Sequence, residues 1–511
     1  MKPTRRRFAS AALAGLAPKS GPRIEGGFVF ESAGQGLDQG HRLRDHARFA
    51  SPARREKTEV VIVGGGVAGL SAAWRLDRRG FRDFVVLEAE QQAGGNARSG
   101  ENEISPYPWA AHYLPVPDVR QTLTRELCAE LGLLDGHTWN EIHLCHSPQE
   151  RLYLHGRWQE GIEPAIGLTK TDAEQFQRFE QLIQELRQTG AFRIPMEEGL
   201  QKSTQEIQGL DRMTLGDWLQ RQGLYSPYLR WYLDYATRDD YGTHYDQISA
   251  WAGLHYFASR EPEDKGPLTW PEGNGWIFKR LLRKLGRFVR TGSMAFHIRR
   301  ENGRWAVFTE QCAYEARCVV FAAPTWLASW IVDPAPPRWP IASAPWITAN
   351  LTLHRWPDNK GLEYAWDNVI YNSTSLGYVI ATHQSLKTYQ PQTVWTWYMA
   401  LADGNAADQR RLLLGGDYAY WQERILADLE RAHPDIRQCV RRIDIFRIGH
   451  AMPRPAPGAI FHPERLRRAR HEGTLVYANC DLSSLSLFEE AQYRGVTAAE
   501  HVLKLVSRAG A

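Results

Sequence analysis

An apolar run that enters a glycine-rich turn occupies residues 59–69, which read EVVIVGGGVAG. The β-branched run predicts a strand buried on both faces of a parallel sheet. Residues 70–76 (LSAAWRL) have helical apolar spacing, and a second apolar run over 84–87 ends at Glu88. This order of strand, GxGxxG turn, helix, strand and acid is typical of a dinucleotide-binding fold.

Each motif position has a physical role in holding a dinucleotide. Gly64 permits the tight turn, and Gly66 lets the backbone approach a pyrophosphate at a helix N-terminus. Gly69 lets the helix pack closely on the strand, and Ala68 lies in the same turn. Glu88 can accept hydrogen bonds from both ribose hydroxyls. We therefore predict that these five residues form a cofactor site.

A second glycine turn, residues 94–98 (GGNAR), follows the acid. Here the chain resembles the GR2 superfamily of FAD-binding proteins, which includes the flavin amine oxidases and the phytoene-desaturase-like enzymes. The resemblance implies FAD, with Gly95 and Arg98 at its phosphates. Residues 108–113 (PWAAHY) are similar to the family segment beside the isoalloxazine ring, which implies that His112 lies at the flavin.

The C-terminal part of the chain resembles the other half of the same FAD site. Residues 319–324 (VVFAAP) are similar to the strand that returns the family's chain to the FAD domain, and Met294 would meet the adenine. Residues 474–481 form a predicted strand ending in Asp481, which the resemblance places near the pyrophosphate and ribityl chain. Phe488 and Glu489 begin a last helix directed at the flavin, where a helix N-terminus stabilises negative charge.

The predicted fold class is α/β, a Rossmann-like FAD-binding domain with a discontinuous α+β substrate lobe. Residues 1–57 are predicted to be signal-like and poorly structured. The FAD-binding domain is predicted to combine residues 58–115, 271–330 and 445–505. The substrate lobe is predicted to combine residues 116–270 and 331–444.

The substrate side departs from a standard amine oxidase at two positions. Such enzymes place a lysine near flavin N5, but residues 346–353 (WITANLTL) contain none, and Leu487 stands where they have an aromatic cage tyrosine. His112 and Phe488 are the predicted catalytic residues. Weaker candidates for the flavin-facing wall are Tyr113, Tyr241, Asp367, His383 and the polar cluster at residues 238–241 (RDDY).

These features predict an FAD-dependent oxidoreductase that transfers hydride from a substrate C–H to flavin N5. Two alternatives stay open: a desaturase or isomerase acting on an apolar, isoprenoid-type substrate, and a redox-inactive flavin-binding assembly protein. The predicted partners are a small-molecule substrate, either an amine or an apolar compound, and an unknown electron acceptor. The aromatic content (19 Trp, 20 Tyr and 18 Phe) suits a cavity wall of either kind.

Composition argues against several other functions. The formal net charge of +4 over 511 residues gives no sign of nucleic-acid binding. The longest apolar runs are too short to cross a membrane. The histidines lack metal-binding spacing, so no metal is predicted. Residues 4–8 (TRRRF) resemble a twin-arginine export signal, which predicts a periplasmic protein; without export it would be cytoplasmic.

Overall fold

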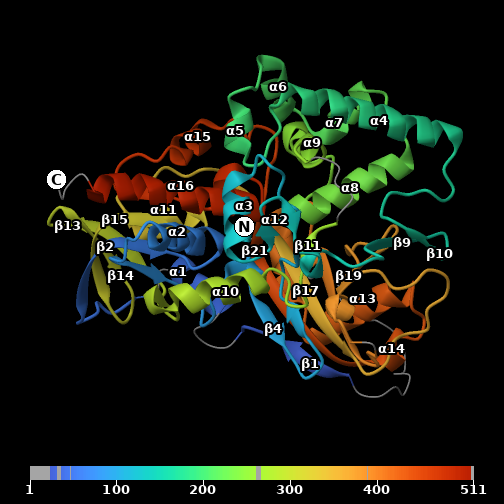
Figure 1. Ribbon diagram of the computed structural model, residues 1–511, viewed down its shortest axis with the longest axis horizontal. Coiled ribbons are helices and arrows are strands. Elements are labelled where there is room, and N and C mark those ends of the chain that lie inside the picture. The colour runs from blue at the N-terminus through green and yellow to red at the C-terminus, as the bar shows by residue number, and fades with distance from the viewer. Residues whose placement is uncertain (1–23, 32–35, 46–47, 261–265, 388, 508–511) are drawn as a thin grey trace, which may run out of the picture.

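The computed structural model describes residues 24–31, 36–45, 48–260, 266–387 and 389–507. The twin-arginine-like segment lies outside these residues. Two eight-stranded sheets form the centres of two lobes, with helices packed around them (Figure 1). No helix in the described part of the chain has both the length and the apolar character that a membrane crossing requires.

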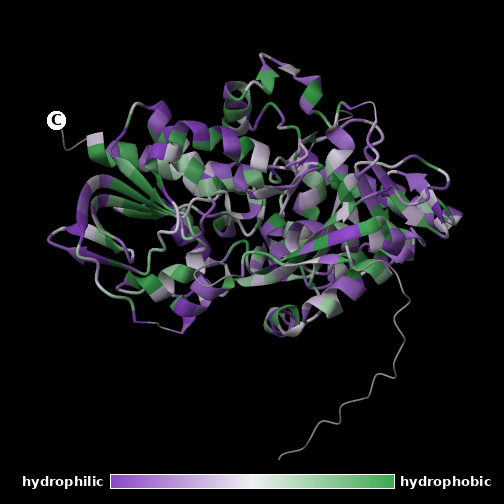
Figure 2. Cartoon of the chain, turned by 90° about the horizontal axis from the view of Figure 1, so that it is seen from below, coloured by the Kyte–Doolittle hydropathy of each residue, from purple (hydrophilic) through white to green (hydrophobic). Residues whose placement is uncertain are grey.

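The first sheet contains the predicted nucleotide-binding strands at its centre, in the order β12-β3-β2-β15-β14-β13-β16, with β22 also paired to β15. Alternate residues of β2 pack into two cores, Val60 and Ile62 on one face and Val61 and Val63 on the other. This two-sided burial explains the continuous apolar run, and the sheet is largely hydrophobic (green) in Figure 2. The strands are β2 (Arg55–Val63), β3 (Phe84–Leu87), β12 (Val289–Arg290), β13 (His297–Glu301), β14 (Arg304–Phe308), β15 (Ala313–Phe321), β16 (Val332–Asp333) and β22 (Leu475–Tyr477).

A close helix crossing joins the two ends of the chain at this sheet. Helix α2 (Val67–Arg78) follows the glycine turn, and α16 (Phe488–Ser507) packs directly against it. A Cβ on Gly495 would lie 2.0 Å from the carbonyl oxygen of Ala68, so only glycine allows this approach. The neighbouring helices α3 (Thr122–Glu130) and α10 (Gly275–Leu285) complete the core on this face.

The second sheet forms the floor of the substrate lobe, in the order β1-β21-β17-β20-β19-β18-β9-β10. Its strands are β1 (Glu25–Phe28), β9 (Glu150–Leu154), β10 (Arg157–Glu160), β17 (Ala342–Leu353), β18 (Asp367–Ile370), β19 (Tyr378–Ile380), β20 (Thr393–Ala400) and β21 (Val440–Arg454). Buried side chains of α12 and α13 pack on it, with α14 alongside; the three helices are α12 (Ala406–Gly415), α13 (Tyr418–Glu430) and α14 (Ile436–Cys439).

A helical subdomain with its own core completes this lobe and lies at the top of Figure 1. Its helices are α4 (Lys170–Thr189), α5 (Met196–Leu200), α6 (Gln205–Gly209), α7 (Leu215–Arg221), α8 (Pro227–Tyr241) and α9 (Ala250–Ala258). The remaining helices are α1 (Leu37–Arg44), α11 (Ala328–Ile331) and α15 (Pro463–Ala469). Three short strand pairs are β4 (Ser99–Glu101) with β5 (Pro106–Pro108), β6 (Tyr113–Leu114) with β11 (Leu268–Thr269), and β7 (Leu134–Asp135) with β8 (Thr138–Trp139).

This architecture confirms the predicted α/β fold but differs from the predicted boundaries in two places. Residues 1–57 were predicted to be poorly structured, whereas β1 pairs in parallel with β21 and α1 packs on the FAD lobe through Leu43. The predicted boundary at residue 445 falls inside β21, which belongs to the second sheet. Both differences have one cause: strand pairing between distant segments leaves little local periodicity in the sequence.

Candidate cofactor and substrate site

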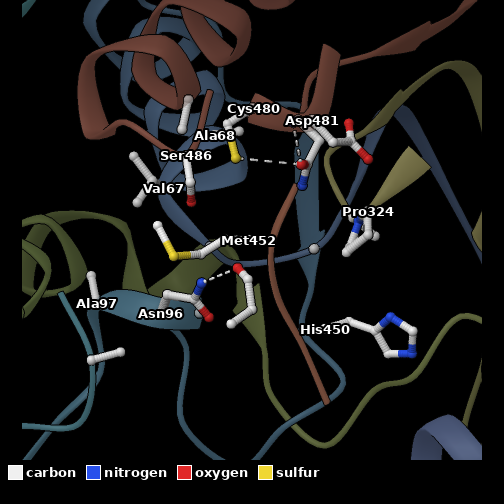
Figure 3. Close-up of a pocket in the computed structure, with 18 of the residues that line it drawn as sticks. Val67, Ala68, Asn96, Ala97, Pro324, His450, Met452, Cys480, Asp481 and Ser486 are labelled. Carbon is white, nitrogen blue, oxygen red and sulfur yellow. Dashed lines mark hydrogen bonds between the residues drawn. The ribbon is translucent and has the colours of Figure 1, made fainter. Parts of the chain in front are cut away.

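A cavity of about 530 Å³ is lined by residues from both lobes. Figure 3 shows its middle, where Val67 and Ala68 at the start of α2 lie across from Asn96 and Met452, with Asp481 and Pro324 beside them. These residues come from five separate segments of the chain. The fold therefore joins the two sequence regions that were predicted to share one cofactor.

The glycines of the turn have two different roles: two of them line the cavity, and the third allows close packing inside the fold. Around Gly66, an added Cβ would find no atom nearer than 3.9 Å, the Cα of Gly95, so the backbone faces open space. Gly64 lines the cavity with a φ of 105°, which favours glycine. Gly69 does not line the cavity; a Cβ there would lie 1.8 Å from the carbonyl oxygen of Gly64. Its role is the predicted close packing of helix on strand.

Glu88 organises the loop at the end of β3. Its carboxylate accepts hydrogen bonds from the backbone N–H groups of Gly65 and Glu90, each at 2.8 Å. Burial raises the pKa of this carboxyl, while these two hydrogen bonds oppose the rise. Glu88 lines the cavity and thus lies where the acid of this motif meets the adenosine ribose.

We expect Glu88→Ala to weaken FAD binding by about 1–3 kcal/mol, because charged hydrogen bonds to the cofactor and to the loop are lost together. Titration of apoprotein with FAD, followed by flavin fluorescence, measures the change. Glu88→Gln retains one acceptor oxygen and should lie between Glu88→Ala and the parent protein. An unchanged dissociation constant in Glu88→Ala would remove this residue from the site.

At the other side of the cavity, Asp481 presents one free carboxylate oxygen. Its Oδ2 accepts hydrogen bonds from the backbone N–H and the hydroxyl of Thr325, at 2.7 and 2.9 Å. Its Oδ1 is buried and has no hydrogen-bond partner among the described residues. Burial raises the pKa of this carboxyl to about 6. An acceptor without a donor at a cavity wall is satisfied by a ligand hydroxyl or N–H group.

The other predicted cofactor residues divide into those that line the cavity and one that does not. Gly95, Met294, Phe488 and Glu489 line it, and the Glu489 carboxylate pairs with Arg260 at 3.1 Å. Arg98 was predicted to contact the pyrophosphate, but its side chain lies behind the wall.

The reason for this difference lies in the contacts of the Arg98 side chain. Its Nε donates to the carbonyl oxygen of Gly95 at 3.1 Å. Its guanidinium lies 4.7 Å from the ring centre of Phe30 and 5.3 Å from that of Phe446. Cation–π contacts of this kind hold the guanidinium against the aromatic rings. Arg98 is therefore placed to support the glycine turn.

An aromatic wall follows the cofactor segment toward the substrate lobe. The ring centroids of Tyr398 and His112 are 4.9 Å apart. Tyr398 also stacks with Trp346, and the two ring planes make an angle of 12°. The Nδ1 of His112 donates to the carbonyl oxygen of Ala110 at 3.0 Å, because a carbonyl oxygen can only accept. Its Nε2 is thereby left as an acceptor. Burial lowers the pKa of His112 to about 4, so the ring is neutral at physiological pH.

Two neighbouring carboxylates, Asp239 and Asp240 at the end of α8, also line the cavity. Burial raises the pKa of both; repulsion from Asp240 raises that of Asp239 further, and repulsion from Glu489 raises that of Asp240. The nearest guanidiniums already bind other acids, since Arg238 pairs with Asp234 and Arg260 with Glu489. Within the described residues neither aspartate makes an ion pair, so ionisation of either one leaves a carboxylate without an ion-pair partner.

Of the weaker candidates for the flavin-facing wall, some line the cavity and others lie elsewhere in the structure. Tyr113 lines the cavity. Asp367 is buried beside Tyr398, whose hydroxyl donates a hydrogen bond to it at 3.5 Å. Tyr241 is fully buried. His383 forms a hydrogen bond with the carbonyl oxygen of His146. The sequence identified the RDDY cluster as a candidate but assigned it no role. It did not predict that Trp346 and Tyr398 line the cavity. Their alternation along strands was visible, but the face they occupy depends on the pairing of β17 with β20.

The cavity fits FAD on observations independent of any bound group. Open space lies at Gly66, an acid follows β3, and Asp481 presents an unsatisfied acceptor on the opposite wall. Residues Gly64, Gly66, Glu88 and Asp481 would hold the dinucleotide. The fold and the cavity thus define an FAD-dependent oxidoreductase. In the described part of the chain, no three His, Cys, Asp or Glu side chains converge as a metal site.

The family follows from a comparison along the sequence. The family model described as "Flavin containing amine oxidoreductase" matches residues 67–503. The chain belongs to this family of FAD-dependent, amine-oxidase-like oxidoreductases.

Solved structures share the fold at low sequence identity. A putrescine oxidase structure, titled as bound to putrescine, superposes with a TM-score of 0.68 at 16% identity and covers 88% of this chain and 100% of its own. Cyclohexylamine oxidase from Brevibacterium oxydans IH-35A gives 0.67 at 15% identity, with the same two coverages. A putative protoporphyrinogen oxidase from Exiguobacterium gives 0.59 at 17% identity over 89% of this chain and all of its own.

Curated relatives match only in short stretches. The L-amino-acid oxidase of Vipera ammodytes ammodytes is 36% identical over 105 residues, 19% of this chain and 21% of its own length. The Drosophila lebanonensis protein anon-37Cs is 49% identical over 45 residues, 9% of this chain and 8% of its own length. The matched part is thus a small fraction of these relatives, so their activities are not transferred to this chain.

Proposed function

We propose that this protein oxidises a cationic amine, with hydride passing from the carbon next to nitrogen to N5 of FAD. The observation that carries the proposal is the pair Asp239 and Asp240, two cavity carboxyl groups that form no ion pair within the described residues. Buried carboxylates are stable when they are paired. A substrate ammonium would supply the missing partner.

The charge of the wall also favours a simple amine over an amino acid. Among the described lining residues the one guanidinium is Arg260, which pairs with Glu489 and attracts Asp240; Asp239 is a third carboxyl group of the same wall. With all three ionised, this group is net negative. A substrate carboxylate would be repelled, whereas an ammonium would be attracted.

His112 and the aromatic wall would prepare the bound amine. FAD, when bound, supplies the hydride acceptor. Because burial keeps His112 neutral, its ring adds no positive charge that would repel the ammonium, and its Nε2 can accept a hydrogen bond from the substrate N–H. Trp346 and Tyr398 would exclude water and fix the apolar part of the substrate.

The position that standard amine oxidases give to lysine falls on β17, which brings Trp346 to the cavity. Leu487 also lines it. Among the described residues that line the cavity there is no lysine, and Leu487 stands at the position of the cage tyrosine. Substrate orientation would therefore come from the acidic wall and the Trp346–Tyr398 pair.

Anaerobic reduction of the purified holoprotein tests this function. We expect aliphatic amines to bleach the visible flavin absorbance, while L-amino acids and apolar isoprenoid-type compounds leave it unchanged over the same time. Bleaching by the apolar compounds alone would favour the desaturase-like alternative. Bleaching by amino acids would contradict the assigned role of the acidic wall. Resistance to every compound would favour a redox-inactive role.

A further inference from the structure

A segment that precedes the family match closes one end of the cofactor cavity. Gly36, Gln39 and Leu43, at or within α1, line the cavity, although the match begins only at residue 67. The Gln39 side-chain amide donates to the carbonyl oxygen of Ala89 at 2.7 Å. The Gly36 N–H donates to the Glu90 carboxylate at 3.0 and 3.1 Å. Helix α1 is therefore fastened to the two residues that follow the ribose-binding Glu88.

The same N-terminal segment is anchored on the other lobe. Strand β1 pairs in parallel with β21, from Glu25 opposite Arg442 to Phe28 opposite Ile445. Glu31 forms an ion pair with the largely buried Arg447 at 2.6 Å. The ring of Phe30 contacts those of Trp109 and Phe446 at centroid distances of 5.4 and 5.1 Å. The described parts of residues 24–45 thus contact the substrate-lobe sheet and the FAD lobe.

The position of α1 identifies which part of the cofactor it covers. In a dinucleotide-binding motif, the acid at the end of the second strand marks the adenosine ribose. Because α1 contacts Ala89 and Glu90 directly, it stands over the adenosine end. Met294, on the same part of the wall, is linked to this loop through Ser293, whose N–H donates to the Glu88 carbonyl oxygen.

We propose that residues 24–31 and 36–45 act as a clasp on FAD, in which β1 is the fixed anchor and α1 is the part that must move before the cofactor can leave. An eight-residue helix is too short to be stable alone, so α1 is held by its tertiary contacts. Bound FAD adds surface for α1, so by linkage the ordered helix binds FAD more tightly. As a cover over the adenosine end, α1 would also slow FAD release. The proposal does not depend on the identity of the substrate.

The test compares FAD release from the holoprotein with that from Gln39→Ala/Leu43→Ser, using excess apoflavoprotein as scavenger. Losing one hydrogen bond and one apolar contact should speed release about tenfold. Arg44→Ala is the matched control on the same helix, because Arg44 is exposed and bonds Asp45 instead of the wall. It should release FAD at the parent rate.

A second measurement separates a clasp from a general loss of stability. Hydrogen exchange of residues 36–45 should be slower in the holoprotein than in the apoprotein, and this protection should be lost in Gln39→Ala/Leu43→Ser while the β2 and β15 amides stay protected. Equal exchange in the apoprotein and holoprotein, or equal release rates in parent and double variant, would overturn the proposal.

Discussion

Gly66→Val should yield a folded, colourless protein. The backbone at Gly66 has φ −79° and ψ −166°, a conformation open to any L-residue. An added Cβ meets no atom within 3.9 Å, so the apoprotein has room for the new side chain. That room is the space where a pyrophosphate would approach the start of α2. We expect FAD affinity to fall by about 100-fold or more, or roughly 3 kcal/mol.

Two other glycines make this result specific. Gly209→Val, at the end of α6, also adds a side chain where no atom lies within 4 Å, but far from the cavity lining, and it should retain FAD. Gly69→Ala should lose flavin for another reason, because its Cβ would collide with the Gly64 carbonyl oxygen and disturb the fold. Circular dichroism and flavin absorbance together distinguish the three. Stoichiometric FAD in a folded Gly66→Val protein would contradict this site.

The parts of the molecule that the sequence predicts are those in which local pattern and tertiary burial agree. Strand β2, the glycine turn and α2 occupy one continuous stretch, so their roles are readable from spacing alone. Asp481 was predicted because the strand that ends at it resembles the family strand whose terminal acid lies near the pyrophosphate and ribityl chain. The FAD assignment is confirmed at the level of the family, whose match extends from residue 67 to 503.

The parts that could not be predicted depend on contacts between distant segments. Arg98 turns toward Phe30 and Phe446, rings that lie 68 positions before it and 348 after it in the chain. Trp346 and Tyr398 reach the cavity because β17 and β20 pair in one register. Asp239 and Asp240 lie in the last turn of an ordinary amphipathic helix, and nothing local reveals that the end of α8 opens into a cavity.

Asp239→Asn should lower the activity on cationic amines and raise the stability of the protein. Loss of a charge partner for a buried ammonium costs about 2 kcal/mol or more, so kcat/KM should fall about 30-fold, chiefly through KM. The same change removes a half-buried carboxyl group that has no ion-pair partner among the described residues, so the melting temperature should rise. Asp135→Asn, at the exposed last residue of β7, is the matched control and should alter neither quantity.

The sign of the pH dependence follows from the direction of the pKa shift. The pKa of Asp239 is raised in the folded protein above the ordinary 3.8, because burial and the neighbouring Asp240 disfavour the charged form. Its protonated form is therefore favoured by folding, and that stability is lost as pH rises toward the folded pKa. The stabilisation by Asp239→Asn should thus increase with pH over this interval. Binding of a cationic amine needs the ionised carboxylate, so kcat/KM of the parent should rise as pH passes through the folded pKa of Asp239, about 8, and the variant's profile should be flatter. Equal profiles, or a variant that loses activity and stability together, would show that Asp239 supports the fold and does not bind the substrate.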